Sequence, residues 1–102
     1  MIGKEILKTI LLTDANNCLS KCNKLIEDLK KDLVEVHRLR DITLHALSIM
    51  DEKTNQTTVQ KAKEILPKLD KELKGAQERL ARALHVYNSV DEDIDRINTT
   101  FS

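Results

Sequence analysis

The chain has 102 residues, with 17 basic and 17 acidic side chains, which is the length of one small domain with no net charge. This balance gives no electrostatic basis for binding nucleic acid, because phosphate contacts require an excess of basic side chains on one face. No run of about 18 apolar residues could insert into a membrane, and residues 1–12 lack the features of a cleaved secretory signal. We therefore expect a cytoplasmic site of synthesis, with export possible only without a cleaved signal, and a protein as the partner.

The first predicted element is a helix over about residues 4–50, because apolar residues recur at alternating intervals of three and four. One row consists of Leu12, Leu19, Ile26, Leu33 and Leu47, and the other of Ala15, Cys22, Leu29, Val36 and Met50. The segment Thr13–Asn17 is more typical of caps and turns. The rows continue through it in register, so we predict one continuous helix.

Two polar residues, Arg40 and Thr43, interrupt these rows. Arg40 could fix the register or the choice of partner at some cost in stability. Alternatively, its charged end could extend to water near the end of the paired region. The two rows of a helix together form an apolar seam along one side of it. From Ile42 to Met50 the apolar surface is wider than this seam, which predicts an additional contact with another chain.

A polar bend is predicted over about residues 51–57, followed by a second helix over about residues 58–99. Thr57 and Gln60 have the spacing of a capping box. The rows of the second helix are Val59, Leu66, Leu73, Leu80, Tyr87, Ile94 and Phe101, and Ala62, Leu69, Ala76, Ala83, Val90 and Ile97. Pro67 removes a helical hydrogen bond, so we predict a kink there or a break before it. Gly75 is a second weak point.

The predicted fold class is all-α. We expect residues 1–102 to form a single antiparallel hairpin of two long helices, since a short connection joins two apolar seams. A two-helix hairpin of this size buries little surface, so we expect it to complete a four-helix bundle or coiled coil with a copy of itself or with another protein. The predicted partner-binding residues are Leu19, Ile26, Leu33, Ile42, Leu44, Leu47, Met50, Leu73 and Leu80.

No residue pattern predicts catalysis, a cofactor or a bound metal. His37, Asp41 and His45 share one face of the first helix, but this face and His85 lie away from the seams, so we interpret them as solvated. The only glycines are Gly3 and Gly75, so there is no glycine-rich phosphate loop. Cys18 and Cys22 are interpreted as reduced, buried small side chains. We therefore predict a protein that is not an enzyme.

The segment Tyr87-Asn88-Ser89-Val90-Asp91, late in the second helix, resembles the Tyr-x-x-x-Asp/Glu export motif of the small WXG (ESAT-like) proteins of type VII secretion. Their length and helical-hairpin layout are also similar. Their Trp-x-Gly turn is absent here, as in some related partners of LXG toxins. The resemblance implies an exported protein or a toxin-targeting factor of a Gram-positive bacterium, with Tyr87 and Asp91 as the export motif.

The predicted function is thus that of a non-enzymatic, helical, partner-binding protein, with type VII export or targeting of an LXG-type toxin as the specific form. The first alternative is a coiled-coil subunit of a larger cytoplasmic scaffold or tethering complex. The second is a cytosolic chaperone or immunity protein that covers an apolar helix of its partner. An effect of Asp91→Ala on secretion would distinguish the export role from a scaffold role.

Overall fold

The computed structural model describes residues 3–102, so the part of the predicted domain formed by residues 1 and 2 lies outside the described residues. Two helices, α1 (Lys4–Ile49) and α2 (Gln56–Thr100), account for nearly all of them, and no strand occurs between residues 3 and 102. The predicted all-α hairpin is confirmed. The prediction of one continuous first helix is also confirmed, since α1 runs without interruption through Thr13–Asn17.

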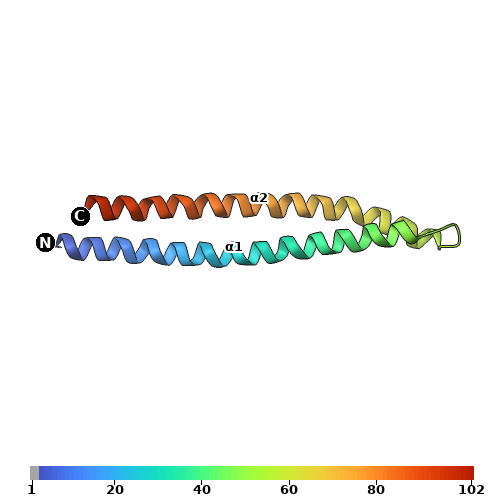
Figure 1. The fold of residues 1–102 in the computed structure, drawn as a ribbon, viewed down its shortest axis with the longest axis horizontal. Coiled ribbons are helices and arrows are strands. Elements are labelled where there is room, and N and C mark those ends of the chain that lie inside the picture. The colour runs from blue at the N-terminus through green and yellow to red at the C-terminus, as the bar shows by residue number, and fades with distance from the viewer. Residues whose placement is uncertain (1–2) are drawn as a thin grey trace. The chain divides into compact units, whose positions relative to one another are not determined.

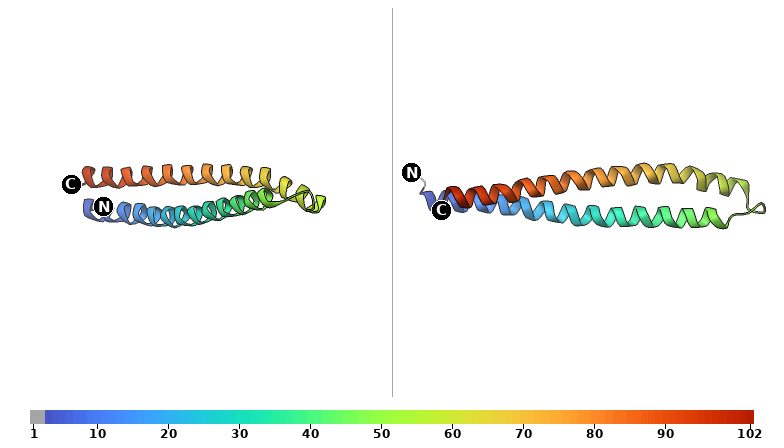
Figure 2. Two further views of the ribbon diagram at one scale, coloured as in Figure 1. Left: turned by 45° about the vertical axis from the view of Figure 1, so that its right-hand side comes forward. Right: turned by 45° about the horizontal axis from the view of Figure 1, so that its top comes forward.

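The chain divides into two compact units, each containing part of both helices. The terminal unit combines α1 up to Asp28 with α2 from Leu80 onward. The loop unit extends from Leu29 to Arg79 and contains the end of α1, the bend and the start of α2. In each unit the two helical segments run side by side in opposite directions (Figures 1 and 2).

The predicted heptad rows form the core of both units. Every residue of these rows between Leu12 and Phe101 is buried or half-buried, including the polar Arg40 and Thr43. The buried apolar side chains are Ile26, Leu29, Val36, Leu69, Ala76 and Ala83. The most buried of these is Ala76, which is 1% exposed. The seam predicted by the three-and-four spacing is therefore the core of the hairpin, because each row turns its apolar side chains toward the other helix.

Polar residues within α1 are accommodated by hydrogen bonds along the helix. The hydroxyl groups of Thr9 and Thr13 donate to the carbonyl oxygens of Glu5 and Thr9, at 2.9 and 2.8 Å. The hydroxyl of Thr43, in the seam, likewise donates to the carbonyl oxygen of Leu39 at 2.8 Å. These bonds satisfy the hydroxyl groups without a partner from outside the helix, which explains how threonine is tolerated here.

The bend is a tight turn built around Asp51 and Thr54. The backbone N–H of Thr54 donates to the carbonyl oxygen of Asp51 at 3.1 Å, and the carboxylate of Asp51 accepts from the N–H of Lys53 at 2.9 Å. The next residue, Asn55, caps α2, because its side-chain oxygen accepts from the N–H of Thr57 at 2.8 Å.

The prediction of a capping box at Thr57 and Gln60 is wrong. Thr57 already lies inside the helix, and the side-chain amide of Gln60 donates forward to Glu64 at 3.3 Å. Asn55 occupies the capping position because its short side chain reaches the free N–H two residues later. As a result, α2 begins two residues before the predicted start.

Pro67 lies inside α2 without interrupting it, so the predicted alternative of a break before Pro67 is wrong. Its side chain is exposed and lies away from the seam. Since proline has no backbone N–H, the carbonyl oxygen of Lys63 cannot receive its usual helical hydrogen bond. The surrounding seam, which includes Leu66 and Leu69, holds the helix together across this defect.

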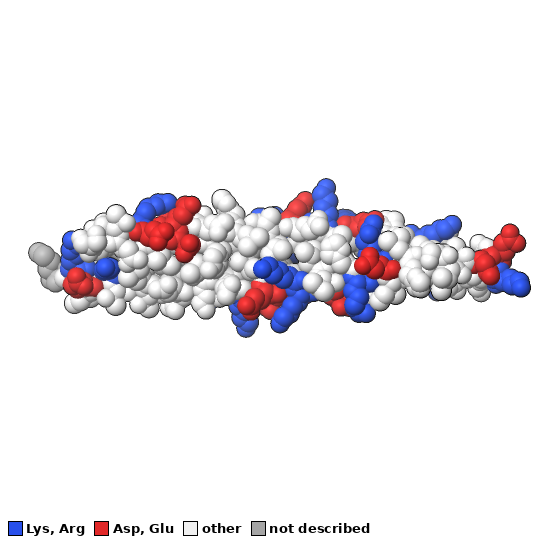
Figure 3. All heavy atoms as spheres, viewed as in Figure 1, with Lys and Arg blue, Asp and Glu red and all other residues white. Residues whose placement is uncertain are grey.

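The outer surface carries charges of both signs, which are mixed on the face shown in Figure 3. Among residues 3–102, no helix is both long enough and apolar enough to cross a membrane.

Candidate helix-binding surface

The exposed apolar side chains are distributed unequally between the two helices. Ten of the thirteen large apolar side chains exposed among the described residues belong to α1 and three to α2. Those of α1 are Ile6, Leu7, Ile10, Leu11, Leu25, Val34, Leu39, Ile42, Leu44 and Ile49, and those of α2 are Ile65, Leu84 and Val86. The first helix is therefore apolar on more than the side that packs against α2, as is typical of a helix that contacts more than one neighbour.

In the loop unit, three of these exposed side chains and the half-buried Ala46 form a second stripe of α1 beside the seam. Leu39, Ile42, Ala46 and Ile49 follow one another at intervals of three, four and three, and we call them the α1 stripe. Ala46 is half-buried, whereas Leu39, Ile42 and Ile49 are 39%, 52% and 69% exposed. With 3.6 residues per turn, the centre of the stripe lies about 100° around the helix from the centre of the seam.

A shallow hollow between the helices shows which side of the loop unit carries the stripe. The hollow has a volume of about 330 Å³ and is lined by Asp32, Glu35, Val36, Leu39, Glu72, Ala76 and Arg79. Leu39 therefore lies on the same side of the hairpin as Glu72 and Arg79 of α2. A chain bound to the α1 stripe would also lie close to this face of α2.

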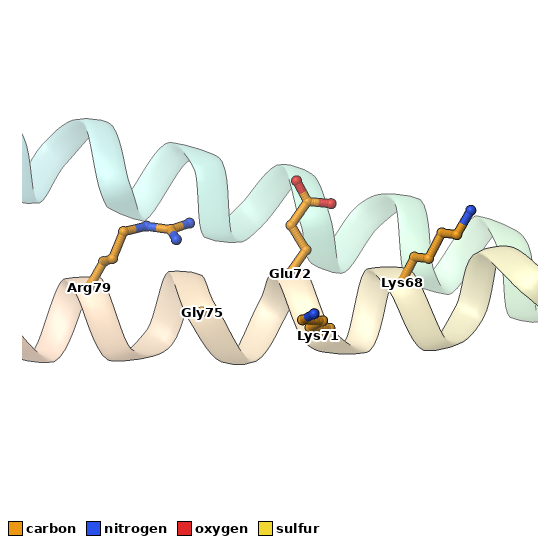
Figure 4. Close-up of a pocket in the computed structure, with 5 residues that line it drawn as sticks. All are labelled: Lys68, Lys71, Glu72, Gly75 and Arg79. Atoms are coloured by element: carbon orange, nitrogen blue, oxygen red, sulfur yellow. The ribbon is translucent and has the colours of Figure 1, made fainter.

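The corresponding face of α2 has a second hollow of about 420 Å³, centred on Gly75. Figure 4 shows Lys68, Glu72 and Arg79 extending from the same side of α2 around the glycine, with Lys71 beside them. A Cβ atom added at Gly75 would meet only the guanidinium group of Arg79, at 3.4 Å. The lining of the hollow is mainly cationic but includes one carboxylate.

Two ion pairs stabilise side chains around this surface. In α1, Arg38 and Glu35 form a pair at 2.6 Å. The hydrogen bond from Arg38, with a smaller contribution from its charge, holds the pKa of the Glu35 carboxyl below its ordinary value. The same hydrogen bond raises the pKa of Arg38. The second pair connects the helices, because Nε of Arg40 donates to Oδ1 of Asp70 at 2.6 Å.

Most of the predicted partner-binding residues pack within the hairpin itself. Ile26 is buried, and a further six are half-buried seam residues, namely Leu19, Leu33, Leu47, Met50, Leu73 and Leu80. Ile42 and Leu44 are exposed, and Leu44 lies on the opposite flank of the seam from the stripe. Sequence reasoning missed Leu39 as a surface residue. The sequence contains a second pair of apolar rows with heptad spacing, Leu39 with Ala46 and Ile42 with Ile49. These rows could have identified Leu39 as part of a second apolar surface.

The residues considered for an export motif lie in the terminal unit. Tyr87 is half-buried in the seam and Asp91 is exposed one helical turn later. The two side chains thus share one flank of α2, and the carboxylate is the more accessible of the two.

The histidines lie on the surface of the helices, away from the seam. His37, Asp41, His45 and His85 are all exposed. No group of three or more potential ligands capable of holding a metal ion occurs within residues 3–102.

Cys18 is exposed and Cys22 is half-buried. The prediction that both cysteines are buried is therefore wrong for Cys18, which lies beside the seam. Burial and the neighbouring Cys18 thiol raise the pKa of Cys22.

No family model, curated protein or solved structure matches this chain.

Proposed function

We propose that this chain is a non-enzymatic protein that acts by packing its helices against another chain. The observation that carries the proposal is the α1 stripe, an ordered apolar surface with heptad spacing that α2 does not cover. Binding of a helix in such an apolar groove depends on anchors at these intervals.

The experiment is an affinity purification of tagged chain after chemical cross-linking in cells that also make untagged chain. Mass spectrometry identifies every bound chain, including the untagged copy. The wild type is compared with Ile42→Asp, which places a charge in the stripe, and with Val34→Asp. Val34 is a matched control because it is 67% exposed but lies on the outer side of α1. A chain retained by the wild type and by Val34→Asp, but lost with Ile42→Asp, supports the proposal. If no bound chain depends on Ile42, the proposal is wrong.

A more specific form of this function is export by a type VII system or targeting of an LXG-type toxin. The exposed carboxylate of Asp91, one turn after Tyr87 near the end of α2, favours this form because a recognition element must be accessible. The test is the amount of secreted chain in a Gram-positive host with such a system. Asp91→Ala should abolish secretion, whereas Asp95→Ala, another exposed carboxylate on α2, should not. Equal secretion of the two variants would exclude this motif.

A further inference from the structure

We propose that Cys18 and Cys22 of α1 form a two-thiolate site for a single soft metal ion, Cu(I). Both cysteines are free thiols. They lie in the terminal unit, so this site is separate from the α1 stripe and from the function proposed for it.

The two thiols lie one helical turn apart on α1. The helix is uninterrupted from Lys4 to Ile49, so residues 18 and 22 have the i, i+4 relationship, in which Cβ atoms are about 5–6 Å apart. Burial is the main cause of the raised pKa of Cys22, and the charge and a side-chain hydrogen bond of Cys18 raise it further. The two sulfur atoms are thus close enough to share one ligand.

The same spacing does not suit a disulfide between the two residues. A disulfide requires Cβ atoms about 3.5–4.5 Å apart, which is less than one turn of an undistorted helix provides. A metal ion between the sulfur atoms makes a longer bridge, because two metal–sulfur bonds of about 2.3 Å span roughly 4–5 Å at a wide angle. An intact α1 therefore keeps the pair as thiols that a single ion can bridge.

The small number of ligands selects the kind of ion. Among the residues three or four positions from either cysteine, Asp14 is the only other potential ligand. No group of three or more ligands capable of holding a metal ion occurs within residues 3–102, whereas a structural zinc site takes four. Thiolates favour soft ions, and Cu(I) is satisfied by two of them in a nearly linear arrangement.

Binding exchanges two protons for one ion. Each thiol releases its proton to the solvent as its metal–sulfur bond forms, so both sulfur atoms bind as thiolates. Without an ion, two thiolates one turn apart would repel each other. The positive charge of the ion lies between them and removes this conflict.

The surroundings of the pair give an ion access on one side and apolar contacts on the others. Cys18 is exposed, so an ion can reach its sulfur directly from the solvent. Cys22 is half-buried in the seam. Leu11 and Leu25, one heptad before and after Cys18, are 37% and 51% exposed. An apolar environment of this kind restricts the access of water to a bound ion.

The test is a titration of the purified, fully reduced chain with Cu(I) in oxygen-free buffer, in competition with a chromophoric Cu(I) chelator. We expect one ion per chain and, by X-ray absorption, two sulfur neighbours for each ion. Cys18→Ser and Cys22→Ser should each raise the dissociation constant about hundredfold or more, because the second metal–sulfur bond forms within one molecule. Circular dichroism of each variant shows whether the helices are retained, so loss of the site can be separated from unfolding.

Two matched variants test the geometry and the choice of ligands. Cys18→Ser combined with Ser20→Cys keeps two thiols, but places them two residues apart, where side chains do not face each other. Ser20 is exposed, so the helix should tolerate this change, and the variant should bind Cu(I) as weakly as Cys18→Ser. Asp14→Asn should leave the affinity for Cu(I) unchanged, because the carboxylate is not a ligand in a two-thiolate site.

Several results would overturn this inference. They are the absence of binding at one ion per chain, an affinity unaffected by Cys18→Ser, and equal affinities of the wild type and the variant with relocated thiols. A stoichiometry of one ion to two chains would also contradict it, as would a loss of affinity with Asp14→Asn. None of these results bears on the proposed function, which is tested at Ile42, so the two proposals fail on different measurements.

Discussion

Replacing Pro67 by alanine should increase the stability of the chain. Pro67 is the twelfth residue of α2, well inside the helix, and its exposed ring contributes nothing to the seam. Alanine would supply the N–H that the carbonyl oxygen of Lys63 lacks and would remove the clash of the proline ring with the preceding turn. Proline is less favourable than alanine by about 3 kcal/mol in a helix interior.

Part of this gain is offset in the unfolded chain, where proline restricts the backbone by an amount worth about 0.4–1 kcal/mol. We therefore expect the free energy of unfolding to increase by about 2 kcal/mol or more. For a chain of this size, this corresponds to an increase in Tm on the order of 10 °C. The assay is urea denaturation followed by circular dichroism at 222 nm. Wild type and variants are compared at one concentration, so that any binding between chains contributes equally to each measurement.

Two further variants make the reasoning refutable. Pro67→Gly should lie between proline and alanine in stability, since glycine costs about 1 kcal/mol relative to alanine. Lys74→Ala, one heptad later on the same exposed face, should change stability by less than about 0.5 kcal/mol. If both Pro67 variants are less stable than the wild type, the proline is required for the packing of the loop unit, and treating it as a defect is wrong.

Three other changes have defined outcomes. Ile26→Ala should lower the free energy of unfolding by about 2–5 kcal/mol in urea denaturation, since this side chain is 5% exposed, whereas Leu25→Ala, at a half-exposed position, should cost less than about 1 kcal/mol. Arg40→Leu should leave the same quantity unchanged or raise it, because the partly exposed pair with Asp70 contributes at most about 1 kcal/mol and leucine would bury more apolar surface. Iodoacetamide should modify Cys18 before Cys22 in peptide mapping, and Cys18→Ser should accelerate modification of Cys22 by removing the thiol that helps to raise its pKa. Equal rates at Cys18 and Cys22 would contradict this last expectation.

The fold could be predicted from the sequence because its determinants are regular. The three-and-four spacing of Leu, Ile, Val and Ala continues through both helices, and every residue of those rows is buried or half-buried in the structure. Even Thr13–Asn17, which local preferences place at a turn, is helical, since two residues of the seam, Leu12 and Ala15, hold it in register.

The start of α2 and the position of the exposed stripe were harder to predict, for different physical reasons. Asn55 and Thr57 are both good capping residues, and a difference of two residues depends on the geometry of the turn at Asp51 and Thr54. The stripe was only partly predicted. The sequence indicated excess apolar surface near Ile42, but which of its residues pack inside the hairpin depends on the direction of α2 around α1. Leu47 and Met50 are used in the seam, whereas Leu39 and Ile49 remain exposed.

The polar positions of the seam connect the fold to the binding surface. Sequence alone left two interpretations of Arg40, and features of both are present: its side chain remains 36% exposed and its Nε reaches Asp70 on the other helix. An exposed ion pair adds little stability, but it is specific in position, because a shift of one residue along α2 would separate the two groups. Arg40 and Thr43 occupy places in the loop unit where leucine would bury more apolar surface. The hairpin seam near the bend is therefore weaker than an all-aliphatic seam, and the adjacent α1 stripe offers the apolar surface through which a second chain would stabilise it.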